Sequence, residues 1–149
     1  MPDRSDTETL RRQLDEAGVR ATPRRLALGA LMNRGAPRHF SAEALWKEAK
    51  GAGLKVSLAT LYNTLNLFVD AGVLRKVDLP GAKVVFDTNT SHHHHQYDVR
   101  TGIVSDLPEG LVVCQPPGHL PGFEIEGFDI VLRVRSIPEA APGDDGHVE

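Results

Sequence analysis

Apolar side chains recur at helical spacing in four stretches of the first half of the chain. The clearest stretch predicts a helix over 58–69 in which one face carries a stripe of apolar residues, Leu58, Leu61, Leu65, Phe68 and Val69. Ser57 is the predicted N-cap, and Gly72 is the predicted C-terminal stop. The opposite face is polar and holds no acidic residue before Asp70, which suits contact with phosphates and base edges. An ordinary solvated helix face is the alternative.

Three further helices are predicted before this one. They are expected over 7–17, 23–34 and 42–51, and the residue before each span, Asp6, Thr22 or Ser41, is its predicted N-cap. Pro23 suits the first helical position, because the amide hydrogen that it lacks would have no partner within the helix there.

A β-hairpin is predicted directly after the helices. Residues 73–77 and 83–86 are expected to form its strands, and Pro80 and Gly81 its turn. Three or four short helices followed by a hairpin make a winged helix. In the related helix-turn-helix geometry the last helix enters the major groove of DNA, and its N-terminal residues meet the bases.

The second half of the chain is expected to be mainly β. Strands are predicted within 99–107, over 123–126 and over 128–135, while the proline- and glycine-rich stretch 115–122 excludes a long helix. A small sheet of this kind needs a cover, and pairing across a homodimer is the simplest way to bury it.

Composition excludes several classes of protein. The single cysteine, Cys114, rules out an internal disulfide framework and a structural four-cysteine zinc site. The chain holds no run of 18 apolar residues, and its N-terminus is too polar for a signal peptide, so we expect a soluble cytoplasmic protein without a membrane partner. It holds no nucleophile paired with a base and no phosphate-cradling loop, so we expect no enzyme.

Charge divides the chain into two unlike parts. Residues 1–76 hold 13 Lys and Arg against 8 Asp and Glu, whereas residues 77–149 hold 4 against 12, so a net charge of −3 conceals a basic front and an acidic back. This division favours a polyanion-binding half joined to a half with another task, although chance clustering of solvated residues would look the same.

A run of four histidines, His92–His95, is the main candidate for chemistry. In a strand, His93 and His95 would point to one side, and the other two to the opposite side. Neutral imidazoles bind Zn, Fe, Ni and Cu, and carboxylates such as Asp87 and Asp106 shift the preference towards harder ions such as Mn. A polar loop exposed to solvent is the alternative.

Five segments of the chain follow a known pattern. They are Gly18–Arg25, His39–Leu45, Val56–Leu65, Ala71–Leu74, and Phe86–Ser91 followed by histidines. Together they resemble the ferric uptake regulator superfamily over residues 7–135. The last segment, with the missing Cys-x-x-Cys pairs, resembles its iron response regulator subgroup.

The resemblance implies an α+β fold and a homodimer. Residues 1–88 would form the winged-helix DNA-binding domain and 89–137 a small α/β, mainly β, dimerisation and sensing domain, while the composition of 138–149 predicts a disordered tail. Two winged helices would straddle a palindromic, double-stranded operator. The residues that the resemblance places at the DNA are Arg20, Thr22, Arg24, Arg25, Ser57, Ala59, Thr60, Tyr62 and Asn63.

The resemblance also implies cofactors. A divalent ion of Fe, Mn or Zn would be held by His39, Asp87, His94 and Asp106, with Gln96 where the family has a further histidine. Haem or a second metal would be held by the cluster of His93, His94 and His95.

The function implied is that of an iron- or haem-responsive regulator of transcription, mainly a repressor of haem-synthesis and iron-utilisation genes when iron is scarce. A zinc- or manganese-responsive regulator of the same fold is one alternative. A histidine-rich metal-storage or metallo-enzyme domain is another, but it would leave the basic front and the acid-free helix face without a task.

Overall fold

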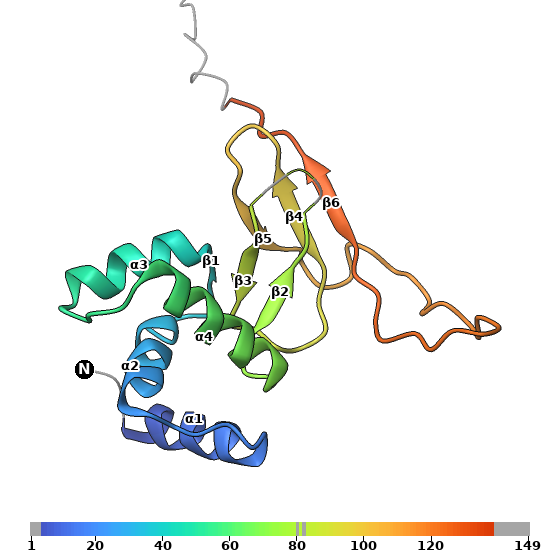
Figure 1. The fold of residues 1–149 in the computed structure, drawn as a ribbon. Coiled ribbons are helices and arrows are strands. Elements are labelled where there is room, and N and C mark those ends of the chain that lie inside the picture. The colour runs from blue at the N-terminus through green and yellow to red at the C-terminus, as the bar shows by residue number, and fades with distance from the viewer. Residues whose placement is uncertain (1–3, 80, 82, 139–149) are drawn as a thin grey trace, which may run out of the picture. The chain divides into compact units, whose positions relative to one another are not determined.

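The computed structural model of the protein describes residues 4–79, 81 and 83–138 (Figure 1). Contacts within it divide the chain into two compact units, one that ends at His92 and one that begins at His93. The predicted domain boundary lies four residues earlier, between 88 and 89, and stays a prediction. Most of the predicted tail, 139–149, lies outside the described residues.

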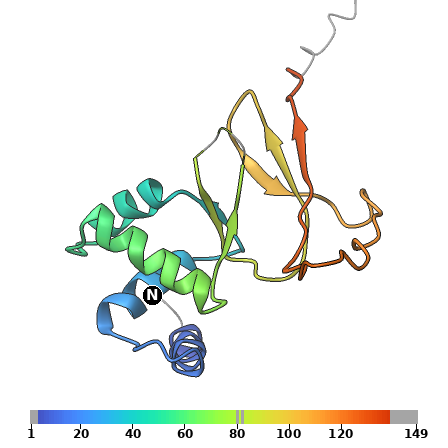
Figure 2. The ribbon, with the colours of Figure 1, turned by 45° about the vertical axis from the view of Figure 1, so that its right-hand side comes forward.

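Among the residues that the structure describes, the N-terminal unit holds four helices and three short strands. They are α1 (Arg4–Glu16), α2 (Pro23–Met32), β1 (His39–Phe40), α3 (Ala42–Gly51), α4 (Leu58–Asp70), β2 (Arg75–Val77) and β3 (Val85–Asp87). The strands form an antiparallel sheet in the order β1-β3-β2. The helices gather on one side of this sheet in both views (Figures 1 and 2). This arrangement is the predicted winged helix.

Side-chain caps start three of the helices where the sequence predicts them. The hydroxyl of Thr22 accepts a hydrogen bond from the Arg25 amide at 3.3 Å, and the hydroxyls of Ser41 and Ser57 accept equivalent bonds at 3.2 and 3.1 Å. The prediction for α1 is wrong at its start, since the helix begins at Arg4. Asp6 therefore lies in its first turn, where a carboxylate still complements the helix dipole.

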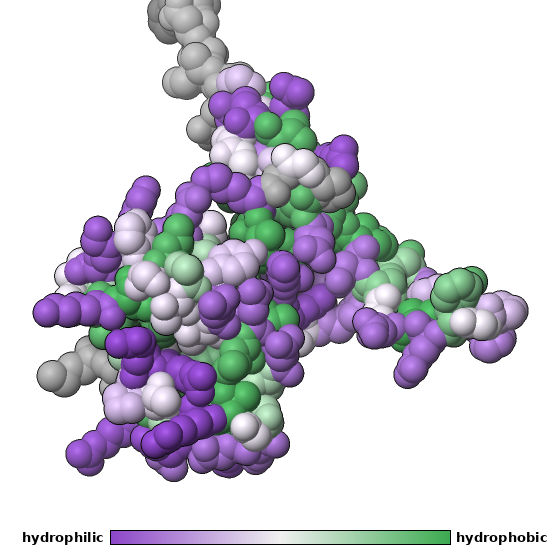
Figure 3. All heavy atoms as spheres, in the orientation of Figure 1, coloured by the Kyte–Doolittle hydropathy of each residue, from purple (hydrophilic) through white to green (hydrophobic). Residues whose placement is uncertain are grey.

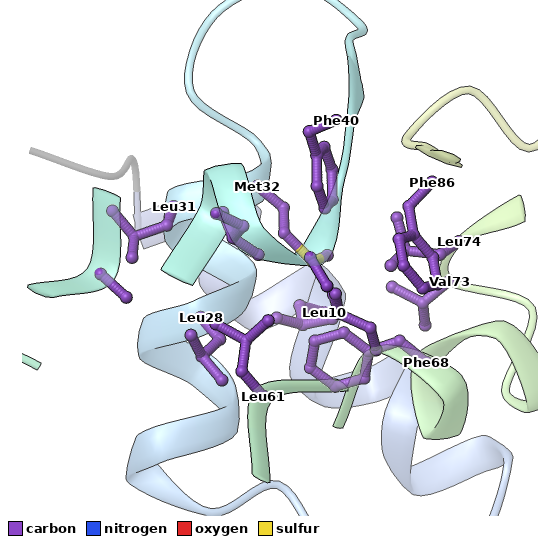
Figure 4. Packing of buried hydrophobic residues seen from close by; sticks show 14 of the residues in the cluster. Leu10, Leu28, Leu31, Met32, Phe40, Leu61, Phe68, Val73, Leu74 and Phe86 are labelled. Carbon is purple, nitrogen blue, oxygen red and sulfur yellow. The ribbon is translucent and has the colours of Figure 1, made fainter. Parts of the chain in front are cut away.

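The apolar stripes predicted from the sequence meet in one core. Figure 4 shows the side chains of Leu10, Leu28, Leu61, Phe68 and Phe86 converging from α1, α2, α4 and β3. Each of these five side chains is at most 2% exposed. Burying apolar surface to this extent is the main stabilising contribution to a unit of this size.

Over residues 93–138, the described part of the C-terminal unit, the structure has one small sheet. Its strands are β4 (His95–Asp98), β5 (Val104–Asp106) and β6 (Val131–Val134), in the order β5-β4-β6. β4 pairs antiparallel with β5 through a tight turn, and it pairs parallel with β6. Gly102, with a φ of 73°, supplies the left-handed backbone conformation that this turn requires.

Three of the predicted β segments differ from the structure. The strand predicted within 99–107 is confined to β5, because its first residues form the turn after β4. No strand forms over 123–126, and within 128–135 only β6 is a strand. Phe123 is 71% exposed and Ile125 is 40% exposed, so their alternation has no facing surface to bury it, and alternation alone does not make a strand.

The segment between β5 and β6 is extended and holds no described helix. Several of its apolar side chains are exposed, and apolar atoms are visible on this segment in Figure 3. These side chains are Leu111, Val113, Leu120, Phe123 and Ile125. Among the described residues, no helix has the length and apolar character that a membrane span needs.

Asp98 closes the turn of the C-terminal sheet. Its carboxylate accepts hydrogen bonds from the amides of Arg100 at 2.9 Å and Ser136 at 3.3 Å. Hydrogen bonds from Ser136, and then from the Arg100 amide, hold the pKa of the Asp98 carboxyl well below its ordinary value of 3.8.

An Asp98→Asn substitution tests this contribution. A depressed folded-state pKa stabilises the unit at pH values above the ordinary one, and that stabilisation is lost as the pH falls through the folded-state value. We expect the variant to be less stable at neutral pH, and its free energy of unfolding to depend less on pH below about 4. Denaturant unfolding followed by circular dichroism between pH 2 and 7 measures both. Two parallel pH profiles would contradict the assignment.

Candidate metal centre and nucleic-acid interface

One imidazole–carboxylate pair lies in the sheet of the N-terminal unit. His39 and Asp87 face each other in the register of β1 and β3. The His39 Nε2 atom lies 3.2 Å from Oδ2 of Asp87, whose side chain is 1% exposed. The other carboxylate oxygen, Oδ1, accepts the amide hydrogen of Asn89 at 2.8 Å.

Neighbouring contacts fix the position of His39. The Arg38 amide donates to the Thr88 hydroxyl at 2.9 Å, and the Thr88 amide donates to the Arg38 carbonyl at 3.1 Å. The Arg38 guanidinium binds both carboxylate oxygens of Glu48 on α3. A hydrogen bond from Arg38 lowers the pKa of Glu48, so this pair stays ionised and holds β1 against α3.

A second group of ligand-type side chains lies within the C-terminal unit. Nε2 of His93 lies 3.1 Å from Oδ1 of Asp106, and Nε2 of His95 lies 3.8 Å from the same oxygen. Each of the three residues offers one ligand atom, and these atoms lie within 4.8 Å of one another. The group is held by strand pairing, because His95 faces Asp106 in the register of β4 and β5.

His94 lies apart from this group. Its Nε2 atom is 3.5 Å from the sulfur of Cys114, and its Nδ1 atom accepts the Ile130 amide hydrogen at 3.4 Å. Its ring contacts Phe128, with ring centroids 5.9 Å apart. The structure thus brings His93 and His95 beside Asp106, whereas the ligand set expected from the sequence has His94 there and stays a prediction.

Gln96 occupies the position where the family has a further metal-binding histidine, but in this structure its side chain makes a hydrogen bond within the sheet. Its side-chain amide donates a hydrogen bond to the Ser105 hydroxyl at 2.9 Å, across the pair of strands β4 and β5. In this structure the Gln96 side chain braces the sheet beside the histidine group.

Two imidazoles and a carboxylate are a chemically sensible set of cation ligands. Neutral imidazole suits Zn and Fe, and carboxylate oxygen suits Mn, so this donor set fits a divalent transition-metal ion. His95 is 1% exposed, His93 is largely buried, and Asp106 is 41% exposed. The group is therefore shielded on the imidazole side, and the carboxylate remains accessible.

The predicted DNA-contacting residues of α4 lie on its outer side. Ser57, Ala59, Thr60 and Asn63 are exposed. Tyr62 is half-buried, and its ring packs edge-on against Phe86 with centroids 6.0 Å apart. The Ser57 hydroxyl also donates to the Thr60 hydroxyl at 2.8 Å, so part of this polar surface stabilises the start of the helix.

The basic stretch before α2 is only partly available to a ligand. Arg20 and Arg24 are exposed. Arg25 donates from Nη1 to the Arg20 carbonyl at 2.6 Å, and the Thr22 side chain caps α2. Arg25 and Thr22 therefore stabilise the start of α2 in addition to the DNA contact expected of them.

Sequence reasoning missed two residues that organise the first pair. Glu48 and Asn89 carry no motif of their own, and only the folded structure brings them beside Arg38 and Asp87. The one available signal was the order of residues 87–91, in which Asp, Asn and Ser alternate at the spacing of turns that side chains stabilise.

Known proteins are similar to this chain over most of its length. The profile of the ferric uptake regulator family matches residues 16–119 of the chain. The ferric uptake regulation protein of Vibrio cholerae is 38% identical over 100 residues, which are 66% of this chain and 67% of the relative. The protein of the same name from Pseudomonas aeruginosa is 31% identical over 126 residues, which are 83% of this chain and 94% of the relative.

Solved structures give the same result. The ferric uptake regulator from Pseudomonas aeruginosa, solved with manganese, superposes with a TM-score of 0.65 at 29% identity, covering 84% of this chain and 96% of the other. The Vibrio cholerae ferric uptake regulator gives 0.67 at 25% identity, covering 85% and 99%. The chain therefore belongs to the ferric uptake regulator family, whose members are metal-responsive transcription regulators that bind operator DNA as dimers and are not enzymes.

Proposed function

We propose that this protein regulates transcription in response to a divalent metal ion held by His93, His95 and Asp106. The observation that carries the proposal is the convergence of these three ligand atoms within 4.8 Å of one another. A relative of the same fold has been solved with manganese, which supports a cation of this kind. We propose His39 and Asp87 as the ligands that the winged helix contributes.

A divalent ion is favoured over haem as the ligand of these histidines. An axial imidazole must present its nitrogen to an open space as wide as a porphyrin, and the buried His95 side chain is 1% exposed. His94 contacts Cys114, whereas the rings of His93 and His95 contact each other, which favours an ion over one haem shared by all three histidines.

Iron is the proposed physiological ion, and repression of haem-synthesis and iron-utilisation genes is the proposed output. The support is the resemblance of Phe86–Ser91 and the following histidines to the iron response regulator subgroup. Zinc or manganese regulation is the alternative, since the same nitrogen and oxygen donors accept both ions.

We propose that α4 reads the operator. Its outer surface presents Ala59, Thr60 and Asn63, the helix itself carries no acidic residue before Asp70, and Arg20 and Arg24 would bind phosphates. Phosphate contacts would position the protein, while the helix would contact base edges.

Metal-dependent operator binding is the direct test of the proposed function. A duplex selected from a random-sequence pool by the purified protein serves as the probe, and fluorescence anisotropy measures its affinity with chelator, Fe²⁺, Mn²⁺ or Zn²⁺, and with haem. We expect one divalent ion to change the affinity at least about tenfold, which equals a coupling free energy of about 1.4 kcal/mol. Equal affinity under all five conditions would refute the sensing role.

An acid placed on the outer side of α4 tests the DNA-binding surface. Asn63→Asp is expected to weaken binding to the selected duplex at least about tenfold, because a carboxylate there faces the phosphate backbone. Gln13→Glu makes the same amide-to-acid change at an exposed position of α1 and serves as the matched control. Equal losses in both variants would show a general charge effect and would contradict the assignment of α4.

A further inference from the structure

Side-chain hydrogen bonds link residues 87–91, which begin with the last residue of β3. Oδ1 of Asp87 accepts the Asn89 amide hydrogen at 2.8 Å. The Asn89 side-chain oxygen in turn accepts from the Ser91 amide at 3.1 Å and from the Ser91 hydroxyl at 2.6 Å. Two successive turns of this kind give residues 87–91 a defined backbone path without any strand or helix.

The far end of this path is fixed to strand β2. Arg75 donates from Nη1 to the Ser91 carbonyl at 2.8 Å, and the same Arg75 lies opposite Asp87 in the register of β2 and β3. Residues 87–91 therefore leave β3 at Asp87 and are held again, at Ser91, by the residue that faces Asp87. We call residues 87–91 and Arg75 the carboxylate loop.

Strand β2 connects directly to the proposed DNA-reading helix. The amides of Val73 and Leu74 donate to the Phe68 carbonyl near the end of α4, at 2.9 and 3.3 Å. Leu74 is 2% exposed and precedes Arg75. The path from α4 to the carboxylate loop thus consists of buried or hydrogen-bonded residues.

We propose that Asn89 is a positioning residue for Asp87 as a metal ligand and that the carboxylate loop links the state of that carboxylate to β2. The Asn89 amide holds Oδ1, which leaves Oδ2 directed towards His39. The Asn89 side chain keeps that amide in place by bonding Ser91. The Arg75 contact then connects the loop to the start of the hairpin that follows α4.

The hydrogen bond to Asn89 would favour the binding of a metal ion by Asp87. A carboxylate whose second oxygen already accepts a hydrogen bond is oriented before the ion arrives, so less orientational freedom is lost on binding. The inference rests on the proposed function, because it assigns Asp87 as a ligand. It adds Asn89 as a residue that does not contact the metal ion but influences the affinity for it. It also adds a route from Asp87 through Arg75 and β2 to α4.

Cobalt titration of the purified full-length protein tests the proposal. The absorption bands of bound Co²⁺ report its ligand geometry, and the titration reports its affinity. Asn89→Ala keeps the backbone amide but removes the acceptor for Ser91, so we expect about tenfold weaker Co²⁺ binding and an altered spectrum. Asn89→Asp restores an acceptor at the same place, and we expect its affinity to be at least that of the parent protein.

Controls separate this idea from simple instability. Asn33→Ala changes an exposed asparagine at the end of α2, and should leave both affinity and spectrum unchanged. Amide hydrogen exchange of the metal-free proteins should show faster exchange at Asn89 and Ser91 in Asn89→Ala, but not in Asn89→Asp.

The outcomes distinguish the two proposals. If Co²⁺ binding to the parent protein is absent, or is unaffected by Asp87→Ala, the assignment of Asp87 as a ligand fails. If the parent binds through Asp87 but Asn89→Ala binds with equal affinity and an equal spectrum, the positioning role of Asn89 is overturned and the assignment of Asp87 stands.

Discussion

Replacing His95 by alanine is expected to lower the affinity of the C-terminal unit for its divalent ion by at least about 100-fold, or about 2.7 kcal/mol. His95 is 1% exposed, it lies beside the Asp106 carboxylate, and its ring centroid is 4.4 Å from that of His93. Removing it leaves the C-terminal unit with one imidazole and one carboxylate, so this unit loses one of its three proposed ligands. Isothermal titration of Mn²⁺ or Zn²⁺ into the purified variant measures the loss.

The other histidines of the run provide matched controls. His94→Ala removes an imidazole one position away that lies beside Cys114, and His92→Ala removes an exposed one. We expect both variants to keep the metal affinity within about threefold of the parent protein, a difference below 1 kcal/mol. A large loss in His94→Ala with none in His95→Ala would restore the ligand set expected from the sequence and refute the one derived from the structure.

Replacing Phe86 by alanine is expected to destabilise the winged helix by about 3–5 kcal/mol. The Phe86 ring is fully buried and stacks on Phe40 with centroids 6.0 Å apart, while Tyr62 of α4 contacts it edge-on. The substitution would leave a cavity between the sheet and the proposed DNA-reading helix, so duplex binding should fall as well. Trp46 is the single tryptophan and lies on α3, so its fluorescence during urea unfolding reports on this unit.

Phe86→Leu is the graded comparison for this substitution. Leucine keeps most of the apolar volume but loses both ring contacts, so we expect less than half of the loss seen with alanine. All variants are compared at one protein concentration, because dimer formation couples stability to concentration. Equal and small losses in both variants would show that the ring does not anchor α4 to the sheet.

Local rules account for most of the N-terminal unit. Hydroxyl caps at Thr22, Ser41 and Ser57 start their helices as predicted, because the cap and the first turn lie within four residues of each other. Strand β1 has only two residues and no periodicity, so no pattern in the sequence could reveal it. Its pairing with β3 is a long-range contact, and that contact brings His39 to Asp87.

The sequence predicts which residue types form the candidate metal centre, but it does not predict which of the histidines lie beside the acid. Alternation along the chain predicts that His93 and His95 share a side, and the structure has both beside Asp106. Which pair faces the acid depends on the register between β4 and β5, and the turn at Gly102 sets that register. A shift of one residue would have presented His94 in their place.

The C-terminal region shows where pattern reasoning fails. Phe123–Glu126 alternates apolar and acidic residues as a half-buried strand does, yet no described strand lies there. A strand needs a neighbour to accept its backbone hydrogen bonds, and the sequence of one segment carries no information on whether that neighbour exists.

The parallel pairing of β4 with β6 has a consequence for the order in which the protein folds. His95 is paired with Val131, so the ends of the segment between their strands must come together before the strand hydrogen bonds can form. Closing a loop of this length has an entropic cost of about 3 kcal/mol. The helical contacts of the N-terminal unit are mostly local, and such contacts form fastest. On the ribosome, we therefore expect α4 and the rest of the N-terminal unit to be folded before the pairing of β4 with β6 completes the C-terminal sheet.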